Sequence, residues 1–275
     1  MTKKSRFNLD FEFPKLTYRL WKVWRRNLDA FMKTYKVNFV PPLLEPILYL
    51  LAIGFGFGAL VSSSSSSTTT ALGGVHYIQF IAPALVSIAM MYGSFFECTY
   101  GSFVRMYYQK TFDGIIATPV SVEEVIAGEL LWGATRSVIN STIVLAVVAA
   151  FGLISSPLAI LVIFLAFLVG LMFSSLGICF TALAPNIDFF NYPGFLFITP
   201  MFLLSGTFFP LTILPKPVQI VAQAILPLTH AVSLTRALIL GRLDMSTLLS
   251  LAWILAVTFV FFIVSINLMK KRLIR

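Results

Sequence analysis

The residues of this chain that could do chemistry are mostly ionisable groups inside apolar stretches. Glu97 lies near the end of one such stretch, and Arg136 lies in the first half of the next. Ionisable side chains in apolar segments are candidates for function because lipid solvates them poorly. Two interpretations stay open for Glu97 and Arg136: a structural ion pair between neighbouring helices, or contact with the polar head group of a lipid.

Motifs for catalysis or metal binding are not found. The two histidines (His76, His230) and two cysteines (Cys98, Cys179) have no metal-ligand spacing. No G-x-x-x-x-G-K-S/T segment is present, so the chain does not hold nucleotide phosphates in a P-loop. An intramembrane lipid or glycan transferase would need paired polar groups at depth, and the sequence does not indicate them. We therefore predict no catalytic residue, no metal site and no cofactor on this chain.

Further candidates are aromatic rings and two basic residues. The rings either pack within the protein or stack on sugar rings and guide an acyl chain. The basic residues, near the outer interface, either contact solvent and head groups or line an exit. The whole set of possible substrate-path residues is Glu97, Arg136, Phe96, Tyr92, Phe208, Phe209, His230 and Arg236.

Composition places these residues in a membrane protein. The chain has 275 residues, of which 58% are hydrophobic and 11% charged, against about 25% charged in a soluble domain. Half of the 20 Lys and Arg lie in the first 36 residues and four lie in the last six. Basic ends around an apolar body follow the positive-inside rule and argue against nucleic-acid binding, despite the net charge of +9.

The predicted fold is an all-α polytopic membrane protein with six transmembrane helices and both termini in the cytoplasm. A span needs about 20 apolar residues. The expected spans are about 38–61, 77–103, 131–151, 158–183, 193–209 and 248–269.

Two further elements flank these spans. Apolar residues recur every three to four positions from Leu16 to Phe31 among basic residues, which predicts an amphipathic interfacial helix before the first span. Short apolar pieces and prolines over 211–243 predict a re-entrant helical hairpin on the outer side. Residues 1–37 then form a cytoplasmic tail with the interfacial helix, residues 38–275 form the membrane domain, and Ser62–Thr70 is an outer loop.

A charged segment, Arg105–Glu129, separates the second and third spans. It combines Arg105, Lys110 and Asp113 with a small apolar face and then a helix-start signal, Ser121 before Glu123-Glu124. We interpret it as the place where a cytoplasmic partner holds the protein, with its glutamates starting the next helix.

Several stretches together resemble the type-2 ABC exporter permeases, in particular the lipo-oligosaccharide export permeases of the nodulation protein J branch. These stretches are L-L-E-P-I-L-Y-L-L-A-I-G-F-G (43–56), F-E-C-T-Y-G-S-F-V-R-M (96–106), T-F-D-G-I-I-A-T-P-V-S (111–121), G-E-L-L-W-G-A-T (128–135), T-A-L-A-P-N-I-D-F-F (181–190), T-P-M-F-L-L-S-G-T-F-F-P (199–210) and L-P-L-T-H-A-V-S-L-T-R (226–236).

The resemblance implies a permease homodimer in the bacterial cytoplasmic (inner) membrane, with two copies of a separate ABC ATPase that binds ATP and Mg²⁺. It implies an amphiphilic cargo moved outward: a lipo-oligosaccharide, a glycolipid or a lipid-linked saccharide. Drug and polysaccharide exporters of the same family are alternatives. The ATPase-coupling residues it indicates are Thr111, Phe112, Asp113, Gly114, Ile115, Ile116 and Pro119, with Phe112, Ile115 and Ile116 as an apolar plug.

Overall fold

The protein is a helical bundle. The computed structural model describes residue 14 and residues 17–57 and 75–274, and regular structure in these ranges is entirely helical. Six segments there are long and apolar enough to cross a membrane, which agrees with the predicted number of spans. They are Leu20–Ile53, Tyr77–Tyr108, Val122–Ala150, Pro157–Leu183, Ile187–Leu204 and Met245–Leu273. The predicted tail and the Ser62–Thr70 loop lie outside the described residues.

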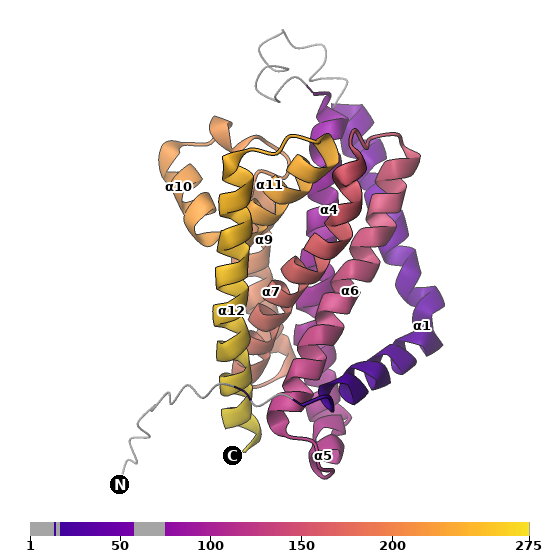
Figure 1. Ribbon diagram of the computed structural model, residues 1–275, viewed down its shortest axis with the longest axis vertical. Helices are drawn as coiled ribbons and strands as arrows, with labels where there is room; N and C mark the ends of the chain where they lie inside the picture. Colours follow the sequence, from indigo (N-terminus) through magenta and orange to yellow (C-terminus); the bar gives the residue numbers. More distant parts are fainter. Residues whose placement is uncertain (1–13, 15–16, 58–74, 275) are drawn as a thin grey trace.

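The first helix differs from its prediction. α1 (Leu20–Tyr49) is one continuous helix that passes into a π-helical stretch to Phe57, so the predicted boundary at residue 37 falls inside it. Figure 1 shows α1 sharply bent, with an oblique first part and a second part along the bundle. Pro41, Pro42 and Pro46 lie inside the helix, where each removes a backbone donor and favours a bend.

The centre of the bundle is formed by α4 (Tyr77–Phe96), α6 (Val122–Ala150) and α7 (Val162–Leu183), and the span that begins with α4 is the most buried of the six. Small residues let these helices approach closely. A Cβ on Gly133 would lie 2.3 Å from Ser174 Oγ, and one on Gly170 would lie 2.4 Å from Ser137 Cβ.

Both helices next to the charged segment are longer than predicted. The second span continues from α4 through π-helical turns at Glu97–Gly101 and Val104–Tyr108. α6 starts at Val122, nine residues before the predicted start, because Ser121 caps it: Ser121 Oγ accepts from Glu124 N at 3.2 Å, and Ser121 N donates to Glu124 Oε2 at 2.8 Å. The helix-start signal is thereby confirmed, and only α5 (Thr111–Ile116) remains between the two helices.

The second half contains a broken span and a bent helix pair. The span Ile187–Leu204 includes a π-helical turn, Gly194–Ile198, and α9 (Thr199–Leu204), and it ends five residues before the predicted end. α10 (Lys216–Ile225) and α11 (Pro227–Leu240) meet at 87°, which agrees with the predicted helical hairpin. α12 (Met245–Leu273) is the last span.

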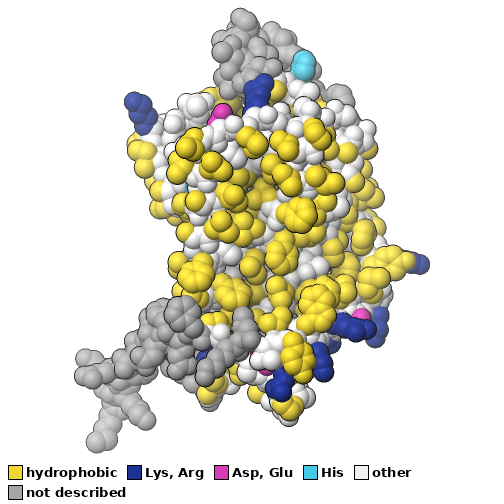
Figure 2. All heavy atoms as spheres, viewed as in Figure 1, with side chains coloured by type: hydrophobic (Ala, Val, Ile, Leu, Met, Phe, Trp, Pro, Cys, Tyr) yellow, Lys and Arg dark blue, Asp and Glu magenta, His cyan; other side chains and the backbone are white. Residues whose placement is uncertain are grey.

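The start of α1, α5 and the end of α12 lie at one end of the bundle, and α10 and α11 lie at the other (Figure 1). Arg19 donates to the Pro119 carbonyl and Lys270 Nζ pairs with Glu123 Oε1 at 2.7 Å, which ties the three segments together. Figure 2 shows Lys and Arg gathered at this end, below a broad hydrophobic band.

Candidate functional site

Two carboxylates and two guanidinium groups form a buried network at the α5 end of the bundle. Arg105 is its centre: Nη1 lies 2.7 Å from Glu97 Oε1, and Nη2 lies 2.6 Å from Glu129 Oε2. Arg136 Nε lies 3.4 Å from Glu97 Oε2, so the predicted pairing of Glu97 with Arg136 is present. The Glu129 side chain is fully buried, and an ion pair at such a site needs every partner in place.

Neutral side chains complete the network. Trp132 Nε1 donates to Glu97 Oε1 at 2.8 Å, and Ser102 Oγ donates to Glu129 Oε2 at 2.8 Å. Asn27 Nδ2 donates to Glu129 Oε1 at 2.7 Å, which fastens the first part of α1 to α6. The network therefore joins three helices, and Arg136 Nε and Nη1 remain without a hydrogen-bond partner in the described structure.

Sequence reasoning missed half of this network. We expected Arg105 in the charged segment that faces a partner and Glu129 near the start of the next helix. Glu129 does lie in α6, but both side chains are enclosed by the bundle. The reason is the length of the helices. Glu97, Gly101 and Arg105 are four residues apart, so they share a face once the second span continues past residue 103.

Asn27 shifts the buried stripe of α1 by one position. The periodicity predicted an apolar face through Leu20, Trp24, Leu28 and Phe31. The buried residues in the first part of the helix are Val23, Asn27 and Phe31, so only Phe31 is shared. This face packs on α6, since Gly128 would place a Cβ 2.6 Å from Val23 Cβ. The helix is therefore held against the bundle by a polar contact that a hydrophobic pattern does not indicate.

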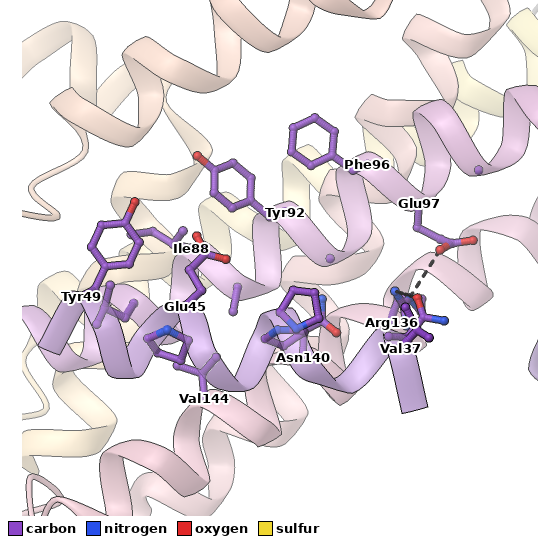
Figure 3. A pocket seen from close by; sticks show the side chains of 18 residues that line it. Val37, Glu45, Tyr49, Ile88, Tyr92, Phe96, Glu97, Arg136, Asn140 and Val144 are labelled. Carbon is purple, nitrogen blue, oxygen red and sulfur yellow. Dashed lines mark hydrogen bonds and ion pairs between the residues drawn. The ribbon is translucent and has the colours of Figure 1, made fainter. Parts of the chain in front are cut away.

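A groove of about 430 Å³ lies between α1, α4 and α6, just beyond the network (Figure 3). One part of it is apolar, with Leu85, Ile88 and Val144, and another is polar, with Asn140 and the Glu97–Arg136 pair. Its remaining lining residues are Val37, Asn38, Pro41, Pro42, Glu45, Pro46, Tyr49, Ala89, Tyr92, Gly93, Phe96 and Gly101.

The groove has a carboxylate without a cation. Glu45 is exposed at the groove beside Tyr49 (Figure 3). No ion pair joins it to any residue of the described ranges, because α1 is continuous and the nearest basic residue before Glu45, Lys36, lies nine positions away along the same helix.

A second cavity of about 430 Å³ adjoins the groove on the side of α5, and Arg26, Arg105 and Tyr100 line it. The two share Asn38, Glu97, Gly101 and Arg136 as lining residues. The Glu97–Arg136 pair therefore stands between a half-apolar groove and a basic cavity.

The predicted substrate-path residues lie in two separate parts of the bundle. Tyr92, Phe96, Glu97 and Arg136 line the groove, and Tyr92 stacks on Phe96 with ring centroids 5.4 Å apart. Phe208, Phe209, His230 and Arg236 do not line it.

The other four lie at the α10/α11 end. Phe208 packs edge-on against Phe202, 5.1 Å between centroids, and Phe209 is half exposed. His230 and Arg236 line a different cavity, so the structure does not bring the eight residues into a single path.

α5 presents a different face from the one predicted. Phe112 is fully buried in its own chain, in a cluster with Phe103, Phe190 and Met269, so it cannot be an exposed plug. Ile115 and Ile116 are partly buried against the same cluster. The residues of this segment that remain exposed are Asp113, Gly114, Ala117, Thr118 and Pro119. Thr111, next to Lys110 with its positive φ of 53°, is half-buried.

The fold defines a class of protein: a multi-pass membrane protein. The family model for the ABC-2 type transporter matches residues 18–240, and the chain belongs to this family as a permease subunit, which is a transport component and not an enzyme. Members of this family work with an ABC ATPase, which agrees with the absence of a P-loop from this sequence.

Relatives cover nearly the whole chain. Nodulation protein J of Bradyrhizobium diazoefficiens is 34% identical over 95% of this chain and 97% of its own length. Nodulation protein J of Sinorhizobium fredii is 32% identical over 92% of this chain and 93% of its own. The inner membrane transport permease YadH of Escherichia coli is 24% identical over 71% of this chain and 73% of its own.

Proposed function

We propose that this permease moves a lipo-oligosaccharide or a related glycolipid outward across the bacterial inner membrane. Two copies form the pathway above two copies of a separate ATPase, which binds ATP and Mg²⁺. The similarity to nodulation protein J over the whole chain and to an inner membrane transport permease supports this assignment.

The observation that carries the proposal is the two-sided lining of the groove. Leu85, Ile88 and Val144 offer an apolar wall that suits an acyl chain. Asn140 and the Glu97–Arg136 pair offer hydrogen-bond donors and acceptors that suit a sugar head group. A purely apolar drug would leave the polar part unpaired, and a polysaccharide without lipid would leave the apolar part unused.

The basic end of the bundle supports the orientation of the permease. The first 36 and the last six residues hold 14 of the 20 Lys and Arg, and the start of α1 and the end of α12 lie beside α5. The positive-inside rule places this end in the cytoplasm. The groove then lies nearer the inner leaflet, and the α10/α11 hairpin lies outside.

In this proposal, α5 couples the permease to the ATPase. Its exposed face, Asp113 to Pro119, is available to a partner, whereas Phe112 joins α5 to the core of the permease. A movement of the ATPase would therefore pass through Phe112 into the bundle, because a rigid element transmits displacement through its packed contacts.

The test is transport in proteoliposomes that contain the permease with its ATPase and a fluorescent lipo-oligosaccharide. Ala89 lines the groove, and Ala89→Trp would fill it. We expect ATP-dependent outward movement to fall at least about tenfold, since a blocked site removes the binding energy of the cargo.

Ala146→Trp is the matched control because Ala146 lies on the exposed surface of α6. It should transport as the unmodified protein does. Equal transport by both variants would contradict the groove as the pathway. Movement of a drug but of no glycolipid would contradict the proposed cargo.

A further inference from the structure

A cavity of about 580 Å³ lies at the other end of the bundle, between α11, α12, the start of α4 and the turn after α9. Its lining has more hydroxyl and amide side chains than that of the groove, beside the charged residues Arg236, Arg242 and Asp244. The hydroxyl and amide residues are Ser205, Gln223, Thr229, Ser233, Ser246, Thr247 and Ser250.

Three of its lining residues have a buried polar atom without a partner in the described structure: Ser205 Oγ, Thr229 Oγ1 and Arg236 Nε. The side chains of Ser205 and Thr229 are 1% and 5% exposed. Buried polar groups are nearly always hydrogen-bonded, so three unpartnered groups around one cavity point to something that binds there. The two hydroxyl oxygens are themselves buried, and a change of side-chain rotamer would turn them to the cavity.

Arg236 is held in place from two sides. Its guanidinium lies over the Phe80 ring, 3.8 Å from the centroid. Its Nη2 donates to the carbonyls of Phe80 at 3.2 Å and Gly206 at 3.1 Å. Gly206 has a φ of 72°, a conformation suited to glycine, so the turn that supplies this acceptor is specified by the sequence. The guanidinium is thus fixed, with Nε unused.

His230 joins the cavity to a tryptophan. Its ring stacks on Trp253 at 4.3 Å between centroids, and its nitrogens lie 3.1 Å from Ser250 Oγ and 2.8 Å from the Gln223 carbonyl. Any ligand that contacts His230 would therefore alter the environment of Trp253. The fluorescence of Trp253 can therefore report binding in this cavity.

We propose that this cavity binds the hydroxyl groups of a neutral saccharide, at a site separate from the groove. Hydroxyl and amide groups both donate to and accept from sugar hydroxyls, and a guanidinium group donates to them. The volume is in the range of small-ligand sites, about 300–1,000 Å³. The choice of a saccharide rests on the proposed function, in which a glycolipid leaves at this end. The presence of the cavity is independent of that function.

Thr229→Val tests the site without harming the fold. It removes a buried hydroxyl that has no partner and keeps the shape, so the thermal stability of the purified permease should stay equal or rise. Thr258→Val is the matched control, since Thr258 Oγ1 donates to Ile254 O at 2.6 Å within its own helix and does not line the cavity.

The experiment measures binding of soluble tetrasaccharides of glucose, mannose and N-acetylglucosamine, each tested singly, through tryptophan fluorescence of the full-length permease in detergent. We expect one of them to bind, with the signal lost in Trp253→Phe. Binding should weaken about tenfold in Thr229→Val, the effect of a lost hydrogen bond at a desolvated site, and should not change in Thr258→Val.

Two results would overturn the inference: no tetrasaccharide binds, so that water alone fills the cavity, or Thr229→Val binds as the unmodified protein does. Because the assay needs neither ATPase nor transport, it separates the two proposals. Saccharide binding without glycolipid transport would contradict the proposed function alone, and transport without saccharide binding would contradict the site alone.

Discussion

The buried ion-pair network and α5 come from the same charged segment, yet they are built in opposite ways. Arg105 and Glu129 bracket the segment in sequence, and their charges are paired inside the bundle. Asp113, which lies between them in sequence, is exposed at the surface. The difference shows how one segment can serve two purposes. Arg105 and Glu129 at its ends hold three helices together, and the residues between them form an exposed polar face, to which we assign the ATPase.

The largest effect should come from breaking the network. Glu129→Leu leaves the Arg105 guanidinium buried with one carboxylate fewer, and we expect a loss of about 3–5 kcal/mol of stability. The midpoint of thermal unfolding in detergent measures it. The double variant Arg105→Met/Glu129→Leu should recover most of the loss, because no unpaired charge remains. A double variant as unstable as Glu129→Leu would contradict the ion pair as the cause.

The next effect tests the inner side of α5. Phe112 is fully buried, so Phe112→Ala should lower the free energy of unfolding by about 3–5 kcal/mol. The loss is smaller where neighbouring side chains move in to fill the cavity. Phe112→Leu should lose less because more of the volume is kept. If Phe112→Ala were as stable as the unmodified permease, then Phe112 would be a contact of the ATPase and not of the core.

A smaller effect is expected for Glu97→Gln, which keeps the shape and an acceptor for Trp132 but removes the charge between Arg105 and Arg136. We expect a loss of about 1–3 kcal/mol. If the network also positions the groove, glycolipid transport by the folded variant should fall. Asp188→Asn, the same loss of a carboxylate charge at an exposed position, should leave transport unchanged.

The smallest effect on stability is expected at the exposed face of α5. Asp113→Lys should change the free energy of unfolding by no more than about 0.5 kcal/mol, as is usual for surface substitutions. ATP hydrolysis should then continue without transport. Lys216→Asp, a charge reversal at the opposite end, is the control. Normal export by Asp113→Lys would contradict α5 as the coupling element.

The sequence predicted the parts of the fold that depend on hydropathy and local signals. Six spans follow from six long apolar stretches, and the start of α6 follows from the Ser121 capping pair. Glu97 and Arg136 could be paired because each lies inside a predicted helix.

The remaining features depend on contacts between segments far apart in the chain. Asn27 is buried only because Glu129 receives its hydrogen bond 102 residues away. Phe112 turns inward because a cluster from several other helices covers it, and its own neighbours in sequence do not indicate that direction. The division of the predicted path into a groove and a separate cavity likewise needs the packed bundle.

The central claim is that the cargo occupies the groove between α1, α4 and α6. The most direct measurement places a photo-reactive phenylalanine at Tyr92, which lines the groove, or at Phe164, which is 73% exposed on α7. With a radiolabelled lipo-oligosaccharide in the assembled transporter, we expect strong labelling at position 92 and only background labelling at position 164. Equal labelling at both positions would show that the lipid merely surrounds the protein, and would contradict the groove as the transport site.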